Sequence, residues 1–183
     1  MKAHKSNLTK FFILSFMFQS VCFSETILDK LKNGYLAIWH SKQTDLYLSG
    51  YAWHNRFTYS KEKIAHFNEL ALGGGMGKTY FDSNGNSHSL YAIGFSDSHS
   101  RFQPVVGYLY QHLFTITPNL KTGLGYTVLV TQRQDMFKHR PFPGILPWGS
   151  IQYKQAGIGA TYIPGSKGAG NVLYLIGRMS WQD

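Results

Sequence analysis

The fold of this chain is decided by Phe102-Gln-Pro-Val-Val-Gly-Tyr-Leu-Tyr-Gln-His-Leu-Phe114. Aromatic and other large side chains fall on one alternate face of this stretch, while the second face carries glycine, glutamine and aliphatic residues without charge. A period of two predicts a β-strand. A soluble sheet would place charged residues on the face opposite its core. The pattern therefore indicates a membrane strand with its aromatic face in lipid and its smaller residues in a narrow lumen.

Seven further segments show the same period of two. They cover residues 45–58, 67–80, 87–96, 120–131, 146–153, 156–162 and 171–181. Asn84-Gly85 predicts a tight hairpin turn, and the longer charged connections 59–66 and 132–140 are expected on the outer side. An even number of strands with alternating short and long connections is typical of bacterial outer-membrane barrels. We therefore predict an all-β fold, an eight-stranded antiparallel transmembrane β-barrel over residues 45–181.

The start of the chain has the pattern of an export signal. Three lysines precede the short apolar run 11–18, and small residues follow up to Ser24. This order predicts a signal peptide over residues 1–24, with the barrel domain over 25–183. The only cysteine, Cys22, would be removed with it, so the exported protein would contain no disulfide. Acylation of Cys22 as a lipoprotein is the less favoured alternative.

Residues 25–40 are predicted to form an amphipathic helix. Ile27, Leu28, Leu31 and Tyr35 can share one face, while charged and polar residues lie elsewhere. Such a helix can lie along a membrane interface or pack on a soluble core, and the barrel pattern that follows favours the interface. The chain carries 18 Lys and Arg against 9 Asp and Glu, a net charge of +9. Because export excludes nucleic acid as a partner, anionic lipid or lipopolysaccharide phosphates are the expected electrostatic partners.

The candidate chemical groups are His54, Arg56, Asp97 and Ser98, at the predicted ends of two strands. A histidine can remove a proton from a hydroxyl near neutral pH. An aspartate can orient it, and a serine can donate to an oxyanion or act as a nucleophile. From the residue types alone, an ordinary solvated rim is the favoured explanation of these residues. The scattered histidines predict no metal site.

Prolines mark a second feature of the predicted rim. Pro141, Pro143 and Pro147 precede one strand, and Pro164 closes another. Proline cannot donate to a ladder, so neighbouring strands there would lack hydrogen bonds. Ordinary loop prolines explain the pattern, and so does a lateral opening through which a lipid tail could enter the lumen.

A set of short motifs occurs in the order found in one known family. The motifs include Asp45-Leu-Tyr47, Trp53-His-Asn-Arg-Phe57, Asn68-Glu69, Gly73-Gly-Gly75, Phe95-Ser-Asp-Ser98, Gly123-Leu-Gly125, Pro141-Phe-Pro-Gly-Ile-Leu-Pro147, Thr161-Tyr-Ile-Pro-Gly165 and Gly170-Asn-Val172. Through them the chain resembles the PagP family of lipid A palmitoyltransferases over nearly its whole exported length. The resemblance implies an outer-membrane enzyme, without metal or cofactor, that moves palmitate from the sn-1 position of a phospholipid to lipid A.

The resemblance also implies roles for individual residues. His54, Asp97 and Ser98 match the catalytic positions of the family, and Arg56 is an expected substrate-binding residue beside them. The prolines of one lateral opening match Pro141 and Pro164, while those of the other are replaced by Ser49 and Ala71. The floor of the acyl pocket corresponds to Leu109 in place of glycine. Acyl transfer is therefore expected more firmly than a preference for palmitate.

These patterns lead to one favoured hypothesis and two alternatives. The first is a monomeric outer-membrane acyltransferase with a phospholipid donor and lipid A as acceptor, which would confer resistance to cationic antimicrobial peptides as in the family. The second is a small barrel without chemistry, serving as a structural protein or adhesin. The third is a secreted soluble lipid-binding barrel, which the aromatic outer face of 102–114 disfavours.

Overall fold

The computed structural model describes residues 26–165 and 170–182, in two compact units that divide after His40. In the first unit, residues 26–39 form a helix, as predicted. The apolar residues of one face, including Leu28 and Leu31, are exposed, and the rings of Tyr35 and Trp39 stack one turn apart. No helix among the described residues is both long and apolar enough to cross a bilayer. The predicted signal peptide, 1–24, lies outside the described residues.

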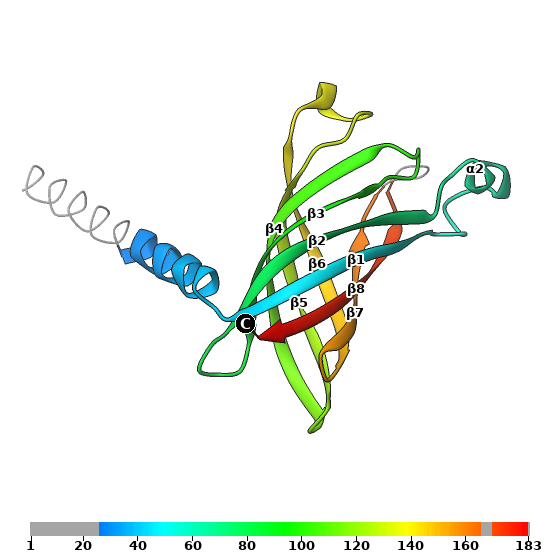
Figure 1. Cartoon of the computed structure of the whole chain (residues 1–183). Coiled ribbons are helices and arrows are strands. Elements are labelled where there is room, and N and C mark those ends of the chain that lie inside the picture. The colour runs from blue at the N-terminus through cyan, green and yellow to red at the C-terminus, as the bar shows by residue number, and fades with distance from the viewer. Residues whose placement is uncertain (1–25, 166–169, 183) are drawn as a thin grey trace, which may run out of the picture. The chain divides into compact units, whose positions relative to one another are not determined.

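The second unit is a barrel of eight strands (Figure 1). The elements are β1 (Gln43–His54), α2 (Lys61–Ala65), β2 (Leu70–Phe81), β3 (Ser87–Ser96), β4 (Phe102–Thr117), β5 (Leu120–Thr131), η1 (Phe137–His139), β6 (Phe142–Tyr153), β7 (Ala156–Ile163) and β8 (Val172–Gln182). Each strand pairs antiparallel with the next, and β8 pairs with β1 to close the sheet. The predicted eight-stranded antiparallel barrel is confirmed.

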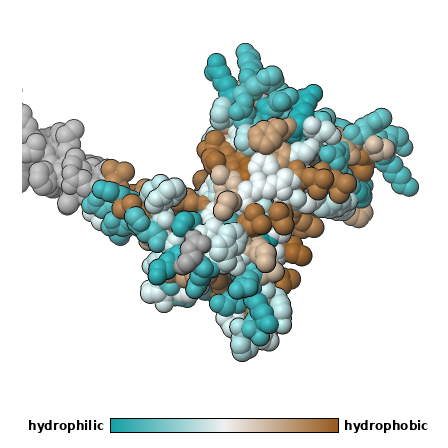
Figure 2. Space-filling view, in the orientation of Figure 1, coloured by the Kyte–Doolittle hydropathy of each residue, from teal (hydrophilic) through white to brown (hydrophobic). Residues whose placement is uncertain are grey.

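Alternate residues of each strand point to opposite sides of the wall. On β4, Phe102 and Val106 are 68% and 53% exposed, whereas Leu109 and Gln111 are fully buried in the lumen. Figure 2 shows hydrophobic residues along the visible wall between hydrophilic ends. A wall of this kind is stable in a bilayer because every backbone group of the closed sheet can pair within the protein.

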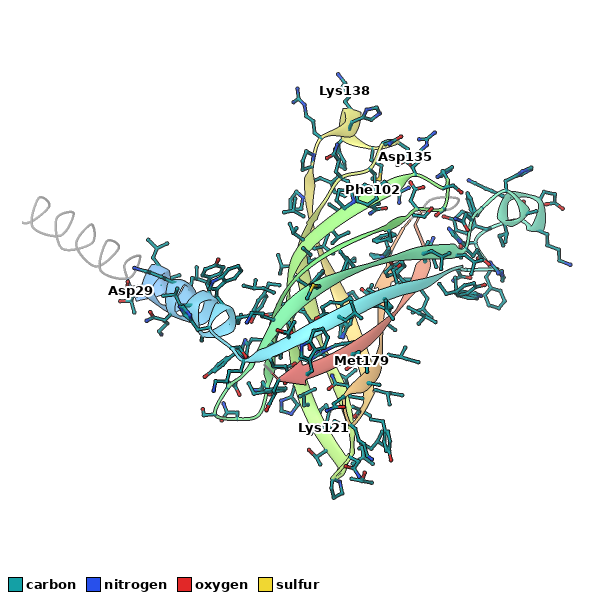
Figure 3. The ribbon with its side chains drawn as sticks, in the orientation of Figure 1. Asp29, Phe102, Lys121, Asp135, Lys138 and Met179 are labelled. Carbon is teal, nitrogen blue, oxygen red and sulfur yellow. The ribbon has the colours of Figure 1, made fainter. Side chains whose placement is uncertain are left out.

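The two ends of the barrel differ in their connections. We call the end that carries α2 and η1 the loop end, and the opposite end, with the tight connections after β2, β4 and β6, the turn end (Figure 1). Figure 3 places Asp135 and Lys138 at the loop end and Lys121 at the turn end. At the turn end, Asp82 accepts hydrogen bonds from the amides of Asn84 and Asn86, which confirms the predicted turn.

Polar side chains fill the lumen in its turn-end half. Arg178 and Asp45 form an ion pair with 3.2 Å between the Nη2 and Oδ1 atoms, and both side chains are buried. Asp45 also accepts hydrogen bonds from Thr79 and Ser180 at 2.5 and 2.6 Å. Because these groups are paired with one another, polar side chains close this part of the lumen, and any apolar cavity must lie nearer the loop end.

The largest departures from the predicted strand bounds are at the end of the first strand and the start of the sixth, and local chemistry explains both. The alternating pattern from Tyr51 was predicted to continue as a strand to residue 58, but β1 ends at His54. The Asn55 side chain accepts from the amide of Phe57, and this local bond turns the chain. The sixth strand was predicted to begin at 146, after the prolines, but β6 begins at Phe142 and contains two of them.

Candidate functional site

The site is built around His54, the last residue of β1. Its side chain is almost fully buried at the loop end. Phe67 stacks on one face of the imidazole with 4.5 Å between ring centroids, and Tyr59 contacts the ring edge-on at 5.5 Å. Both aromatic residues come from the connection between β1 and β2, so the turn after His54 brings back the rings that hold it.

One ring nitrogen of His54 faces a hydroxyl. The Nε2 atom lies 3.1 Å from Oγ of Ser98, which belongs to the connection between β3 and β4. The amide of Asn68 donates to the Ser98 carbonyl at 2.8 Å and fixes that connection against the segment before β2. A base and an alcohol at this separation can exchange a proton, so the structure brings together two of the three predicted catalytic residues.

The third predicted residue has a different place from the one expected. Asp97 was predicted to hold the histidine, but its Oδ1 atom accepts hydrogen bonds from the amides of His99 and Arg101 at 2.8 and 2.9 Å. These bonds shape the turn that carries Ser98. The carboxylate bonded to His54 is that of Glu69, whose Oε1 lies 3.1 Å from Nδ1 of the imidazole. The expectation that Asp97 bonds to His54 is therefore wrong in this structure.

Glu69 was not singled out as a site residue in the sequence, because the motif Asn68-Glu69 supports the family resemblance without assigning a role to the carboxylate. The antiparallel pairing of β1 with β2 provides the signal that could have found it. The amide of Ala52 donates to the Glu69 carbonyl at 2.9 Å, so a residue just before β2 must lie beside the end of β1. A predicted hairpin with a histidine at one strand end and a carboxylate at the facing end would have suggested the pair.

Arg56, the expected substrate-binding residue, is also bonded to Glu69. Its two terminal nitrogens each donate to one carboxylate oxygen at 2.6 Å, and one also donates to the His54 carbonyl at 2.9 Å. This bidentate pair holds the pKa of Glu69 well below its usual range. Arg56 is partly exposed and does not line the cavity described next, so its observed role is to hold the carboxylate.

An apolar cavity of about 210 Å³ occupies the loop-end half of the lumen. Its wall comes from all eight strands and is mostly aliphatic and aromatic. Its lining includes Ile93, Phe95, Val105, Leu129, Leu146, Ile163, Val172 and Ile176. Asp97, Ser98 and Arg133 line the cavity as well, from connections at the loop end. The serine bonded to His54 is thus part of the wall of a space suited to an alkyl chain.

The floor of the cavity is aromatic. The ring of Tyr91 on β3 covers Gly107 of β4, where an added Cβ would approach the ring to 2.6 Å. Its hydroxyl forms a 2.6 Å hydrogen bond with Thr127 on β5, so the side chain spans three strands. Leu109, the predicted pocket floor, is fully buried two residues nearer the turn end and does not line the cavity. That prediction is wrong because Tyr91 crosses the lumen before Leu109 is reached.

The wall is incomplete between β6 and β7. β6 pairs with β5 along its whole length but pairs with β7 only from Trp148 onward. Pro143 and Pro147 both lie in the unpaired part of β6. Alternate residues direct their N–H groups to the same neighbour, so these two prolines remove donors from one edge. Because the ladder to β5 continues past them, the missing donors face β7.

The gap leads to the cavity. Phe142, Gly144 and Leu146 of the unpaired part of β6, and Ile163 at the end of β7, all line the cavity. Pro141 and Pro164 do not line it but flank the gap, one just before β6 and one just after β7.

The position of the other lateral opening, where Ser49 and Ala71 replace the prolines of the family, is bridged between β1 and β2 in the structure. A register shift follows Ser49 there, and its hydroxyl donates to the Ala71 carbonyl across the seam.

Comparison with known proteins agrees with this architecture. Residues 35–178 match the family described as "Antimicrobial peptide resistance and lipid A acylation protein PagP". The chain belongs to the PagP family. A protein of Legionella pneumophila named "Lipid A acyltransferase PagP" is 55% identical over 142 residues, which cover 78% of this chain and 76% of that protein.

Two other proteins named "Lipid A acyltransferase PagP" show similar identity to this chain. The protein of Legionella longbeachae serogroup 1 (strain NSW150) is 55% identical over 146 residues, 79% of this chain and 63% of the relative. The protein of Bordetella pertussis (strain CS) is 52% identical over 141 residues, 77% of this chain and 78% of the relative. The matched family range contains His54, Glu69, Asp97 and Ser98. Among residues 26–165 and 170–182, no three His, Cys, Asp or Glu side chains group closely enough to hold a metal ion.

Proposed function

We propose that this protein is a monomeric outer-membrane acyltransferase that moves a fatty acyl chain from the sn-1 position of a phospholipid to lipid A. Membership of the PagP family and the names of the relatives support the reaction class and the acceptor. The observation that carries the proposal is the position of Ser98, which lines the apolar cavity while bonded to the buried His54. An ester bound with its tail in the cavity would place its carbonyl beside both groups.

The gap between β6 and β7 supports entry of the donor tail from the bilayer. A phospholipid tail could pass between the unpaired edges without leaving an apolar environment, since residues of both edges line the cavity. The cavity then holds the tail extended, and its depth down to the Tyr91 ring limits the length of the chain that fits. Palmitate, with its sixteen carbons, is the proposed chain because the family resemblance implies it.

The chemistry requires one base. The lipid A hydroxyl attacks the ester carbonyl carbon while its proton passes to Nε2 of His54. The bond from that carbon to the glycerol oxygen then breaks, and the same proton passes from His54 to the leaving oxygen. The products are acylated lipid A and a lysophospholipid, so atoms and charge balance. Ser98 donates to the carbonyl oxygen during the attack, or forms an acyl-enzyme first, and both routes use the same base and give the same products.

Mass spectrometry of lipid A tests this proposal. Cells of a strain lacking the gene would carry the wild-type chain, His54→Gln, or the matched control His66→Gln. His66 is exposed at the end of α2 and has no role in the site. We expect an added acyl mass with the wild type and with His66→Gln, and none with His54→Gln, at equal amounts of folded barrel. A wild-type chain that adds no acyl mass, even after outer-leaflet phospholipid is induced, would contradict the proposal and favour a structural or adhesive barrel.

A further inference from the structure

We propose that Glu69 is the positioning residue of the site, holding His54 in the one tautomer whose Nε2 can accept a proton. This inference rests on the proposed acyl transfer and names the carboxylate that supports its base. Ser98, His54 and Glu69 then form a continuous chain, with 3.1 Å on each side of the imidazole. The order hydroxyl, imidazole and carboxylate is the arrangement in which a histidine serves as a base at neutral pH.

The contacts of Glu69 show that its carboxylate is fixed rather than free to turn. Oε1 accepts from the backbone amide of His54 at 3.0 Å and from Arg56, and it lies 3.1 Å from the imidazole Nδ1. Oε2 accepts from the Tyr51 hydroxyl at 2.8 Å and from the second Arg56 nitrogen. A carboxylate held by four donors in addition to the imidazole cannot leave Nδ1 without breaking several bonds at once.

This arrangement decides the protonation of the imidazole. The Arg56 pair keeps Glu69 ionised at neutral pH, so its oxygens can only accept. The 3.1 Å contact is therefore a hydrogen bond only when Nδ1 of His54 carries the proton. In a neutral imidazole the lone pair is then on Nε2, which faces Ser98 Oγ. Glu69 thereby sets the nitrogen that acts as the base.

In the part of the chain that the structure describes, no other carboxylate forms an ion pair with His54. One oxygen of Asp97 is used by two amides of its own turn. The segment before β2, by contrast, reaches all parts of the site. Phe67 stacks on the imidazole, Asn68 donates to the Ser98 carbonyl, and Glu69 bonds to the imidazole. Three consecutive residues therefore orient both His54 and Ser98, and Glu69 supplies the charge.

Nitrogen NMR of the imidazole tests the tautomer without relying on acyl transfer. The ¹⁵N-histidine-labelled barrel in detergent micelles would be compared with His54→Gln to assign the His54 ring signals. We expect the wild type near neutral pH to show a protonated Nδ1 and an unprotonated Nε2. In Glu69→Gln the amide can also donate to Nδ1, so we expect a clear rise of the form protonated on Nε2. The matched control Glu62→Gln, an exposed carboxylate in α2, should leave the signals unchanged.

Kinetics on the same variants test the consequence. With a micellar phospholipid donor and lipid A as acceptor, we expect Glu69→Gln to lower kcat at least tenfold with little change in KM, because Glu69 does not line the cavity. Glu62→Gln should behave as the wild type. A wild-type ring protonated on Nε2 would overturn the inference, and this needs no variant to fold. A Glu69→Gln barrel with unchanged tautomer and kcat would overturn it too. A wild type that transfers nothing to lipid A would instead refute the proposed function, leaving the tautomer result to stand by itself.

Discussion

Replacement of Val105 by phenylalanine should shorten the acyl chain that the protein accepts. Val105 is buried in the lumen and lines the cavity, two residues nearer the loop end than Gly107, which the floor ring of Tyr91 covers. A phenyl ring at this position fills the lumen above the present floor. The substitution therefore raises the floor without removing any group of the site.

The size of the effect follows from strand geometry. Two residues of an antiparallel strand rise about 6.8 Å, and a tilt of about 40° reduces this to about 5 Å along the barrel axis. An extended chain advances about 1.2 Å per bond, so the pocket loses room for about four methylenes. Each methylene left unburied weakens binding of the acyl chain by about 0.8 kcal/mol, so about four methylenes weaken it by about 3 kcal/mol. At 1.4 kcal/mol per tenfold, transfer of the chain that the wild type prefers should fall on the order of 200-fold.

The assay offers a series of phosphatidylcholines with ten to eighteen carbons per chain to the purified barrel in micelles, and measures the acyl mass added to lipid A. Val105→Phe should move the optimum about four carbons shorter, while Val106→Phe, the same change on the neighbouring lipid-facing residue, should leave the profile unchanged. An unchanged optimum in a folded Val105→Phe barrel would refute the assignment of this cavity as the acyl site. Equal shifts in both variants would refute the geometric reasoning.

Three further predictions concern stability, each measured by urea unfolding of the barrel in liposomes. Ser49→Ala should lower the free energy of unfolding by about 1–3 kcal/mol, because the buried Tyr174 hydroxyl loses its hydrogen-bond partner. Adding Tyr174→Phe should recover part of that loss. If the losses of the two single variants simply add in the double variant, the pairing is contradicted. The low pKa of Glu69 means that its contribution to stability is complete above about pH 5, begins to be lost below the unfolded value of about 4.3, and continues to fall until the pH passes the much lower folded pKa. Glu69→Gln should therefore weaken the loss of stability below pH 5, and an identical acid profile would contradict this. Asp45→Leu should destabilise the barrel by about 3–5 kcal/mol because it leaves Arg178 buried without its ion pair. The double variant Asp45→Leu with Arg178→Met should be close to the wild type in stability. A double variant as unstable as Asp45→Leu would count against the ion-pair explanation.

Much of the wall could be predicted from the sequence because the side-chain period of a strand is a local property. The bounds predicted for the third and fifth strands agree with β3 and β5 as observed, and Gly85 lies in the predicted hairpin turn with a φ of 79°. The largest errors in the predicted strand bounds occur at two kinds of place. At one, a local hydrogen bond ends the strand although the alternation continues; at the other, a proline lacks a donor but the strand continues. Asn55 turns the chain although the alternation continues, and Pro147 lies inside β6 because only its β7-facing edge is unpaired.

The candidate site could be predicted only in part. His54 and Ser98 were expected at the ends of two strands that meet at the outer rim, and the structure places Nε2 of His54 3.1 Å from Oγ of Ser98. Glu69 was missed, and Leu109 was placed in a floor that Tyr91 makes instead. Both errors concern contacts between different strands, whose partners depend on register and on how far each side chain reaches across the lumen.

The sequence by itself determined the eight strands of the barrel, because each strand shows its alternation between outward-facing and lumen-facing side chains along the chain itself. Only the tertiary structure decided which carboxylate supports His54, where the cavity ends and which seam is open. Those features arise when closure of the sheet brings together residues such as Glu69 and His54, fifteen positions apart, at a distance fixed by strand pairing. A change of a few tenths of an ångström in the distance between donor and acceptor weakens or breaks a hydrogen bond. The order of residues along the chain does not specify such distances.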